Sequence, residues 1–132
     1  MIDTNILLVD DDTDTCDSMS DVFLDLGYTV DMAHDGASAL EMSGGHHYRV
    51  ALLDYSMPGM DGLELCRRLK NMQPNIVVAL ITGFASITTG EAAEAGIKCS
   101  FLKPVNFSLL IPLVEKIVGN FGFRRLGSVV QT

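Results

Sequence analysis

The chain has 132 residues, 48% of them hydrophobic and 20% charged, which suits one domain with a buried core. Its net charge is −8, and 13 of its 17 acidic residues lie at or before Asp61, a stretch in which Arg49 is the single base. This distribution argues against nucleic-acid binding, and the sequence contains no apolar run of about 20 residues that could span a membrane.

Three cysteines, Cys16, Cys66 and Cys99, are widely spaced and form no CxxC pair. We therefore expect buried, reduced thiols and neither a disulfide framework nor a zinc site. No charged and apolar leader follows Met1, so secretion is not supported and a cytoplasmic location is expected.

Short apolar runs alternate with segments of helical periodicity along the whole chain. In chain order, we expect a strand at 5–9, a helix at 13–26, a strand at 29–33, a helix at 36–42, a strand at 49–54, a helix at 63–72, a strand at 76–82, a helix at 86–95, a strand at 100–102 and a helix at 107–118.

Local signals define the ends of several of these elements. Gly27 ends the first helix and Asp35 is the N-cap of the second. His46 and His47 are expected in a solvated loop, because adjacent side chains do not face one metal ion. Pro112 should either move the start of the last helix towards Leu109 or bend its first turn. The acidic residues of the first helix are expected to form a solvated face: Asp14, Asp17, Asp21 and Asp25.

Alternating strands and helices predict an α/β fold with a parallel sheet and right-handed crossovers. Five strands and five helices fit a flavodoxin-like, doubly wound sheet of order 2-1-3-4-5. Ligands of such folds bind at the carboxyl ends of the strands, in the crevice between strands one and three.

Five polar side chains follow the ends of the predicted strands: Asp10, Asp11, Asp54, Thr82 and Lys103. Two carboxylates about 4 Å apart repel by roughly 4 kcal/mol at an effective dielectric constant near 20, so three at one edge favour a bound cation. A small pocket of carboxylate oxygens selects Mg²⁺, and an aspartate beside it can attack phosphorus. Thr82 and Lys103 could then contact the charged group that is transferred.

Four segments carry a resemblance to a known family: residues 9–12, 53–62, 81–83 and 103–104. The run from Asp54 to Gly62, Asp-Tyr-Ser-Met-Pro-Gly-Met-Asp-Gly, is the most specific of them. Together they resemble the signatures of receiver domains of two-component response regulators, and the resemblance covers residues 4–119.

The resemblance implies a role for each matching residue. Asp54 would accept a phosphoryl group from the phosphohistidine of a sensor histidine kinase or a phosphotransfer protein. Mg²⁺ would be held by Asp11 directly, by Asp10 through a water, and by Asp54 and the backbone carbonyl of Ser56.

The remaining implied roles concern the last two strands. Thr82 and Lys103 would contact the phosphoryl oxygens, and the bond from Lys103 to Pro104 would be cis. Receivers of this family usually carry an aromatic residue three positions before the lysine, and here that place is Ser100. Phe101 should point to the other side of its strand, so the usual aromatic part of the switch is in doubt.

Two further expectations go beyond the shared motifs. Phe84 lies two residues after Thr82, and we expect it to restrict attacking water and to prolong the life of the phosphoryl group. Residues 120–132 contain Arg124 and Arg125 but no acid. They are either a terminus or the start of a linker, or a segment that packs on the domain or docks a partner.

The sequence therefore predicts a receiver domain at residues 1–119 that works as a signalling switch through a downstream protein, with no direct contact to nucleic acid or membrane. It would catalyse its own phosphorylation and dephosphorylation, but it would not be an enzyme for an outside metabolite. The chain is either a stand-alone receiver of the chemotaxis type or a domain excised from a hybrid kinase or multidomain regulator.

Two other classes of protein share parts of this pattern. A haloacid-dehalogenase-type phosphatase also uses Mg²⁺ and an aspartyl phosphate, but its first motif fails at the last residue in the run from Asp10 to Cys16. A flavodoxin-like cofactor binder would need a first loop rich in Ser, Thr and Gly, whereas three aspartates would repel a phosphate.

Overall fold

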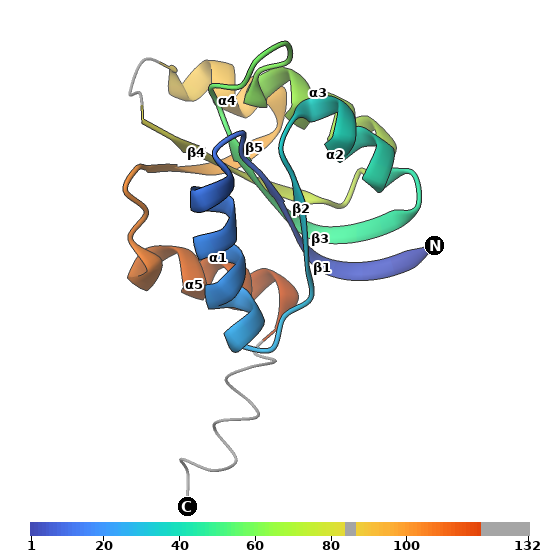
Figure 1. Ribbon diagram of the computed structural model, residues 1–132. Coiled ribbons are helices and arrows are strands. Elements are labelled where there is room, and N and C mark those ends of the chain that lie inside the picture. Colours follow the sequence, from blue (N-terminus) through green and yellow to red (C-terminus); the bar gives the residue numbers. More distant parts are fainter. Residues whose placement is uncertain (84–86, 120–132) are drawn as a thin grey trace, which may run out of the picture.

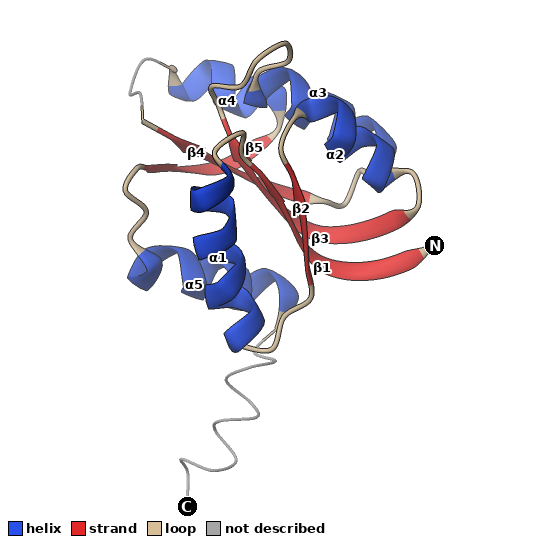
Figure 2. Cartoon of the chain, in the orientation of Figure 1, coloured by secondary structure: helices blue, strands red, loops and turns tan. Residues whose placement is uncertain are grey.

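The computed structural model describes residues 1–83 and 87–119 (Figures 1 and 2). Strands and helices alternate along this part of the chain. The strands are β1 (Ile2–Val9), β2 (Val30–Ala33), β3 (His46–Asp54), β4 (Val77–Thr82) and β5 (Ile97–Leu102). The helices are α1 (Thr13–Asp25), α2 (Gly36–Ser43), α3 (Gly62–Met72), α4 (Thr89–Ala95) and α5 (Phe107–Val118).

The strands form one parallel sheet in the order β2-β1-β3-β4-β5, which confirms the predicted topology. The central strands β1, β3 and β4 are almost fully buried along their carboxyl-terminal halves. Helices cover both faces of the sheet, and this burial explains why the sequences of these strands are almost continuously apolar.

The helices lie in two layers, with α1 and α5 on one face of the sheet and α2, α3 and α4 on the other (Figure 1). Phe23 of α1 and Val114 of α5 belong to the core of the first face, together with Ile6 and Leu52 of the sheet. The core of the other face includes Leu65 and Leu69 from α3. The hydrophobic stripe of each helix therefore faces the sheet, and the right-handed crossovers determine which side of the sheet each helix covers.

Each helix begins at a residue whose side-chain oxygen accepts a hydrogen bond from a backbone N–H of the first turn. These N-caps are Asp12, Asp35, Asp61, Thr88 and Asn106. They satisfy donors that have no partner within the helix, and they confirm the prediction for Asp35.

The prediction of a loop at His46 and His47 was wrong, because both residues belong to β3. They pair with Ile2 and Asp3 of β1, so both strands start earlier than their apolar runs suggest. Nδ1 of His46 lies 2.9 Å from an oxygen of Asp31, and Nδ1 of His47 lies 3.6 Å from an oxygen of Asp3. Polar partners thus take the place of apolar burial at this end of the sheet.

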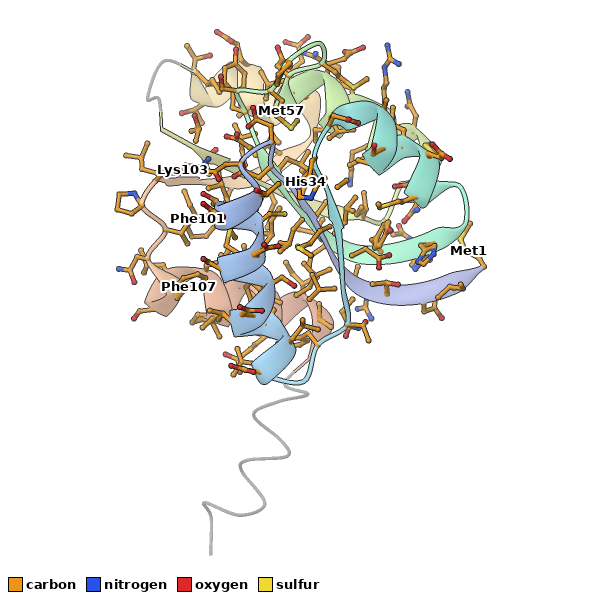
Figure 3. All side chains as sticks on the ribbon, viewed as in Figure 1. Met1, His34, Met57, Phe101, Lys103 and Phe107 are labelled. Carbon is orange, nitrogen blue, oxygen red and sulfur yellow. The ribbon has the colours of Figure 1, made fainter. Side chains whose placement is uncertain are left out.

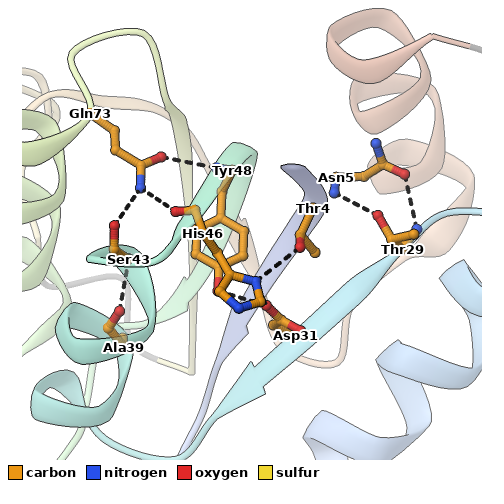
Figure 4. Close-up of polar contacts among 9 residues, drawn as sticks. All are labelled: Thr4, Asn5, Thr29, Asp31, Ala39, Ser43, His46, Tyr48 and Gln73. Carbon is orange, nitrogen blue, oxygen red and sulfur yellow. Dashed lines mark hydrogen bonds and ion pairs between the residues drawn. The ribbon is translucent and has the colours of Figure 1, made fainter. Parts of the chain in front are cut away.

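The carboxamide of Gln73 completes the edge of β3 where β4 has not yet begun (Figure 4). Its oxygen accepts a hydrogen bond of 2.9 Å from the backbone N–H of Tyr48. Its nitrogen donates to the backbone carbonyls of Ser43 at 3.0 Å and His46 at 2.7 Å. The buried side chain of Gln73 therefore makes hydrogen bonds to β3 that a neighbouring strand would otherwise make.

Three other elements differ from the predictions. α4 starts at Thr89, three residues after the predicted start at 86, because Thr88 is its N-cap. β5 starts at Ile97, three residues before the predicted start, and it is an edge strand with mixed burial that periodicity describes poorly. α5 starts at Phe107 with Pro112 inside it, so a start nearer Leu109 was wrong. The ring of Pro112 leaves the carbonyl of Ser108 without its helical donor, but Ser108 is exposed and water can solvate it.

Candidate functional site

Five side chains predicted from strand ends lie at the same edge of the sheet: Asp10, Asp11, Asp54, Thr82 and Lys103. The parallel register causes this, since Val9 pairs with Leu53 and Thr82 pairs with Leu102. The backbone N–H of Lys103 also donates to the carbonyl of Thr82 at 2.9 Å.

Lys103 bridges two of the carboxylates. Its Nζ lies 3.0 Å from Oδ2 of Asp10 and 3.4 Å from Oδ1 of Asp54, and both acids are about nineteen-twentieths buried. Burial by itself would lower the pKa of Lys103, but Asp10 and Asp54 outweigh it and the pKa is raised. The ammonium group therefore stays charged and faces both acids.

The carboxyl group of Asp54 has a raised pKa. Burial and the neighbouring charge of Asp10 raise the pKa of its carboxyl group to about 6, although Lys103 acts in the opposite direction. One ammonium group does not balance the acids gathered here, and the site carries an excess of negative charge near neutral pH.

The acid cluster has the chemistry of a cation site. Carboxylate oxygens of Asp10, Asp11 and Asp54 lie within 4.8 Å of one another, and within the described residues these three form the only such group. Oxygen ligands of this charge suit a hard divalent cation such as Mg²⁺. Asp10 is also oriented, because its Oδ1 accepts a hydrogen bond of 2.9 Å from the backbone N–H of Asp12. Ser56 lies in the loop after β3 and is exposed.

The loop between β3 and α3 holds Asp54 tightly. The backbone N–H of Tyr55 donates to Ile81 at 3.2 Å, and that of Gly62 donates back to Tyr55 at 2.9 Å. A Cβ on Gly62 would lie 2.7 Å from the carbonyl oxygen of Asp54, so a glycine allows α3 to start directly behind this strand end. The glycine that ends the run from Asp54 to Gly62 therefore has a packing cause.

The sequence analysis did not select His34, which lies directly after the carboxyl end of β2 and is labelled in Figure 3. Its Nδ1 lies 3.1 Å from the backbone oxygen of Asp10, and the side chain is exposed. His34 directly follows β2, so the same strand-end argument that selected Asp10 and Asp54 could have found it.

Residues of the last two strands also bear on the predictions for the site. The peptide bond between Lys103 and Pro104 is cis, as the resemblance implied. Ser100 is exposed, whereas Phe101 packs against the core under α1 and α5, which confirms that the two side chains point to opposite sides of β5. Phe84 lies outside the described residues, so its expected effect on water stays a prediction.

The thiols only partly match the expectation. Cys16 and Cys66 are buried, and burial raises the pKa of each to about 11. Cys99 is half-buried, because β5 is an edge strand, so the expectation of burial was wrong for this residue. All three are free cysteines.

Comparison with known proteins agrees with this geometry. A family model described as "Response regulator receiver domain" matches residues 6–115. The response regulator MprA of Mycobacterium ulcerans is 36% identical over 114 residues, which are 86% of this chain and 49% of MprA. The transcriptional regulatory protein ZraR of Escherichia coli (strain K12) is 32% identical over 117 residues, or 88% of this chain and 26% of ZraR.

Solved structures show the same similarity. A CheY-like receiver domain protein from Methanospirillum hungatei JF-1 has 32% sequence identity and a TM-score of 0.80, with 86% of this chain and 93% of that chain covered. TrrA from Thermotoga maritima, solved in complex with Mg²⁺ and BeF, has 26% identity and a TM-score of 0.77, with coverages of 89% and 99%.

The chain therefore belongs to the receiver-domain family of two-component response regulators. It spans about a quarter to a half of the length of the curated relatives it matches. These matches give no support to the phosphatase alternative. Across residues 1–83 and 87–119, the structure contains no helix that is long and apolar enough to cross a membrane.

Proposed function

We propose that Asp54 accepts a phosphoryl group from the phosphohistidine of a sensor histidine kinase or a phosphotransfer protein. The observation that carries this proposal is the position of its carboxylate, which is buried at the carboxyl edge of the sheet with the Lys103 ammonium 3.4 Å away. Asp54 has one cationic neighbour, Lys103, and two anionic neighbours, Asp10 and Asp11. Together with a cation, these groups suit a highly charged substrate.

The proposed transfer is a simple substitution at phosphorus. An oxygen of Asp54 forms a bond to phosphorus while the bond from phosphorus to the imidazole nitrogen breaks, and the electron pair leaves with the imidazole. The ammonium group of Lys103 forms an ion pair with a phosphoryl oxygen, and this ion pair replaces part of its present contact with Asp54. Thr82, at the end of the adjacent strand, donates a hydrogen bond from its hydroxyl group to another phosphoryl oxygen.

The residues present fit Mg²⁺. Asp11 and Asp54 would hold it directly, Asp10 through a water, and Ser56 through its backbone carbonyl. When bound, the ion would neutralise charge on the acids and on the transferred group. Support comes from the cluster of three carboxylates and from the Mg²⁺ reported with the related TrrA.

Partners and organisation belong to the same proposal. Residues 1–119 form the receiver and residues 120–132 a tail or the start of a linker, since the family match ends at residue 115 and α5 ends at Val118. Phosphorylation switches contacts with a downstream protein, and no outside metabolite is converted. Three cysteines without disulfides support a cytoplasmic location. A stand-alone receiver and a domain of a longer protein both fit the partial coverage of the relatives.

The test is to incubate the protein with Mg²⁺ and an acyl phosphate, and to locate the modified residue by mass spectrometry. Wild type should gain one phosphoryl group on Asp54, and Asp54→Ala should gain none. Asp3→Ala, which removes an exposed acid far from the edge, serves as the control. Modification that persists in Asp54→Ala contradicts the proposal.

A further inference from the structure

A groove of about 590 Å³ separates α1 from the segment that joins β5 to α5. Its apolar lining consists of Met19 from α1 and Pro104, Val105 and Phe107 from the other side. One end of the groove reaches Lys103, and Figure 3 labels Lys103 and Phe107 beside α1.

The surface next to the groove is strongly acidic. Four carboxylates of α1 occupy positions i, i+3, i+7 and i+11, and all are exposed: Asp14, Asp17, Asp21 and Asp25. At about 100° per residue these positions fall within an arc of roughly 80°. α1 contains no basic residue, so the stripe has no internal partner. A segment that fills this groove should be apolar and should carry positive charge beside it.

The chain contains such a segment. All 17 acidic residues precede position 120, whereas residues 120–132 carry Arg124 and Arg125 and no acid. Five apolar side chains accompany the two arginines: Phe121, Phe123, Leu126, Val129 and Val130. The segment therefore complements the groove in charge and in hydrophobicity.

The last described residue, Gly119, lies beside the turn that follows α1. The hydroxyl of Tyr28, in the turn after α1, donates a hydrogen bond of 2.9 Å to the carbonyl of Gly119. Tyr28 packs edge-on against Phe23, and Phe23 packs edge-on against Phe107 of the groove, with ring centroids 6.2 and 6.5 Å apart. Gly119 is thus held at the C-terminal end of α1.

The reach is sufficient. Thirteen extended residues span at most about 45 Å, whereas the 13 residues of α1 rise about 20 Å. A path that starts at Gly119 and runs antiparallel to α1 passes Asp25 and Asp21 before it reaches Met19.

We propose that residues 120–132 dock in the groove between α1 and the β5–α5 segment, with Arg124 and Arg125 paired to the acidic stripe. This docking does not depend on the proposed function.

The test compares amide NMR spectra of the full chain and of the double variant Arg124→Glu/Arg125→Glu. Docking predicts that the amides of Thr15, Ser18, Met19 and Phe107 shift in this variant. About 0.5 M salt, which screens exposed ion pairs, should move the same wild-type amides in the same direction. The matched control is Arg67→Glu/Arg68→Glu, which changes charge equally on the exposed face of α3 and should leave the groove amides in place.

A charge swap makes the test stricter. Adding Asp21→Arg and Asp25→Arg to the double variant should return the groove amides towards their wild-type positions. Unchanged groove amides in the Arg124→Glu/Arg125→Glu variant, or changes confined to α4 and β5, would overturn the proposal. Shifts that grow with protein concentration would overturn it too, because they would identify the occupant as a second copy of the chain.

Discussion

The carboxyl group of Asp54 lies where desolvation and a neighbouring acid oppose its ionisation. Its pKa of about 6 means that it holds a proton more firmly than the same residue in an unfolded chain, whose pKa is 3.8. Between these values the unfolded state loses its proton first, so folding becomes less favourable as the pH rises through this window. Above pH 6 the full penalty is present.

Replacement of this residue gives a prediction with a definite sign. Asp54→Asn should stabilise the metal-free protein by about 1–2 kcal/mol at pH 7, because it removes a buried charge while Lys103 keeps Asp10 as its partner. Below pH 4 the advantage should vanish. Urea unfolding with a chelator present, at both pH values, measures it, and a variant less stable than wild type at pH 7 would contradict the assignment.

At the scale of elements, α3 begins in close contact with the end of β3, because a Cβ on Gly62 would lie only 2.7 Å from the carbonyl oxygen of Asp54. Only a hydrogen at Gly62 allows α3 to begin against the backbone of Asp54 and the side chain of Leu80. The geometry of the strand end and that of the helix start are therefore linked.

Gly62→Ala should destabilise the protein by about 1–3 kcal/mol and slow its phosphorylation by an acyl phosphate, because the new methyl group displaces the strand end that carries Asp54. Gly45→Ala is the control, since a Cβ there meets nothing within 4 Å. Thermal unfolding and the phosphorylation rate are the measurements. Equal stability of the two variants would show that the join tolerates a side chain.

A second element-scale prediction concerns the open edge of β3. Gln73→Ala should lower the free energy of unfolding by about 2–3 kcal/mol, because it leaves the N–H of buried Tyr48 and two carbonyls without partners. Asn71→Ala, an exposed change in the last turn of α3, two residues before Gln73, should alter it by less than about 0.5 kcal/mol. Urea denaturation of both variants decides whether the carboxamide really closes this edge.

At the scale of the whole molecule, cation binding and folding are linked through the acids that the sheet gathers. The unfolded chain has no such cluster, so a cation that binds the folded state stabilises it by mass action. The effect should weaken as the pH falls below the pKa of Asp54 of about 6, where this ligand becomes neutral.

With Mg²⁺ at 100 times its dissociation constant, the gain in unfolding free energy should be about 2.7 kcal/mol at pH 7.5 and clearly smaller at pH 5. Asp11→Asn should remove most of the gain, whereas Glu94→Gln, an exposed change on α4, should keep it. Melting curves with and without Mg²⁺ provide the measurement. A gain that survives in Asp11→Asn would place the cation elsewhere.

The sequence by itself determined the sheet order and the positions of the five site residues. Short apolar runs such as 6–9 and 50–53 are characteristic of strands covered on both faces, and parallel strands bring their carboxyl ends to one edge. The apolar runs and the parallel topology are therefore enough to place Asp10, Asp54 and Lys103 at one edge of the sheet.

Only the tertiary structure decided what happens where apolar burial is incomplete. His46 and His47 extend β3, and Gln73 supplies the missing neighbour, through contacts between residues at least 15 positions apart. Likewise, the raised pKa of Asp54 depends on burial and on the distances to Asp10 and Lys103. Periodicity records which side chains avoid water, but hydrogen bonds and charge interactions between distant segments leave no periodic pattern to detect.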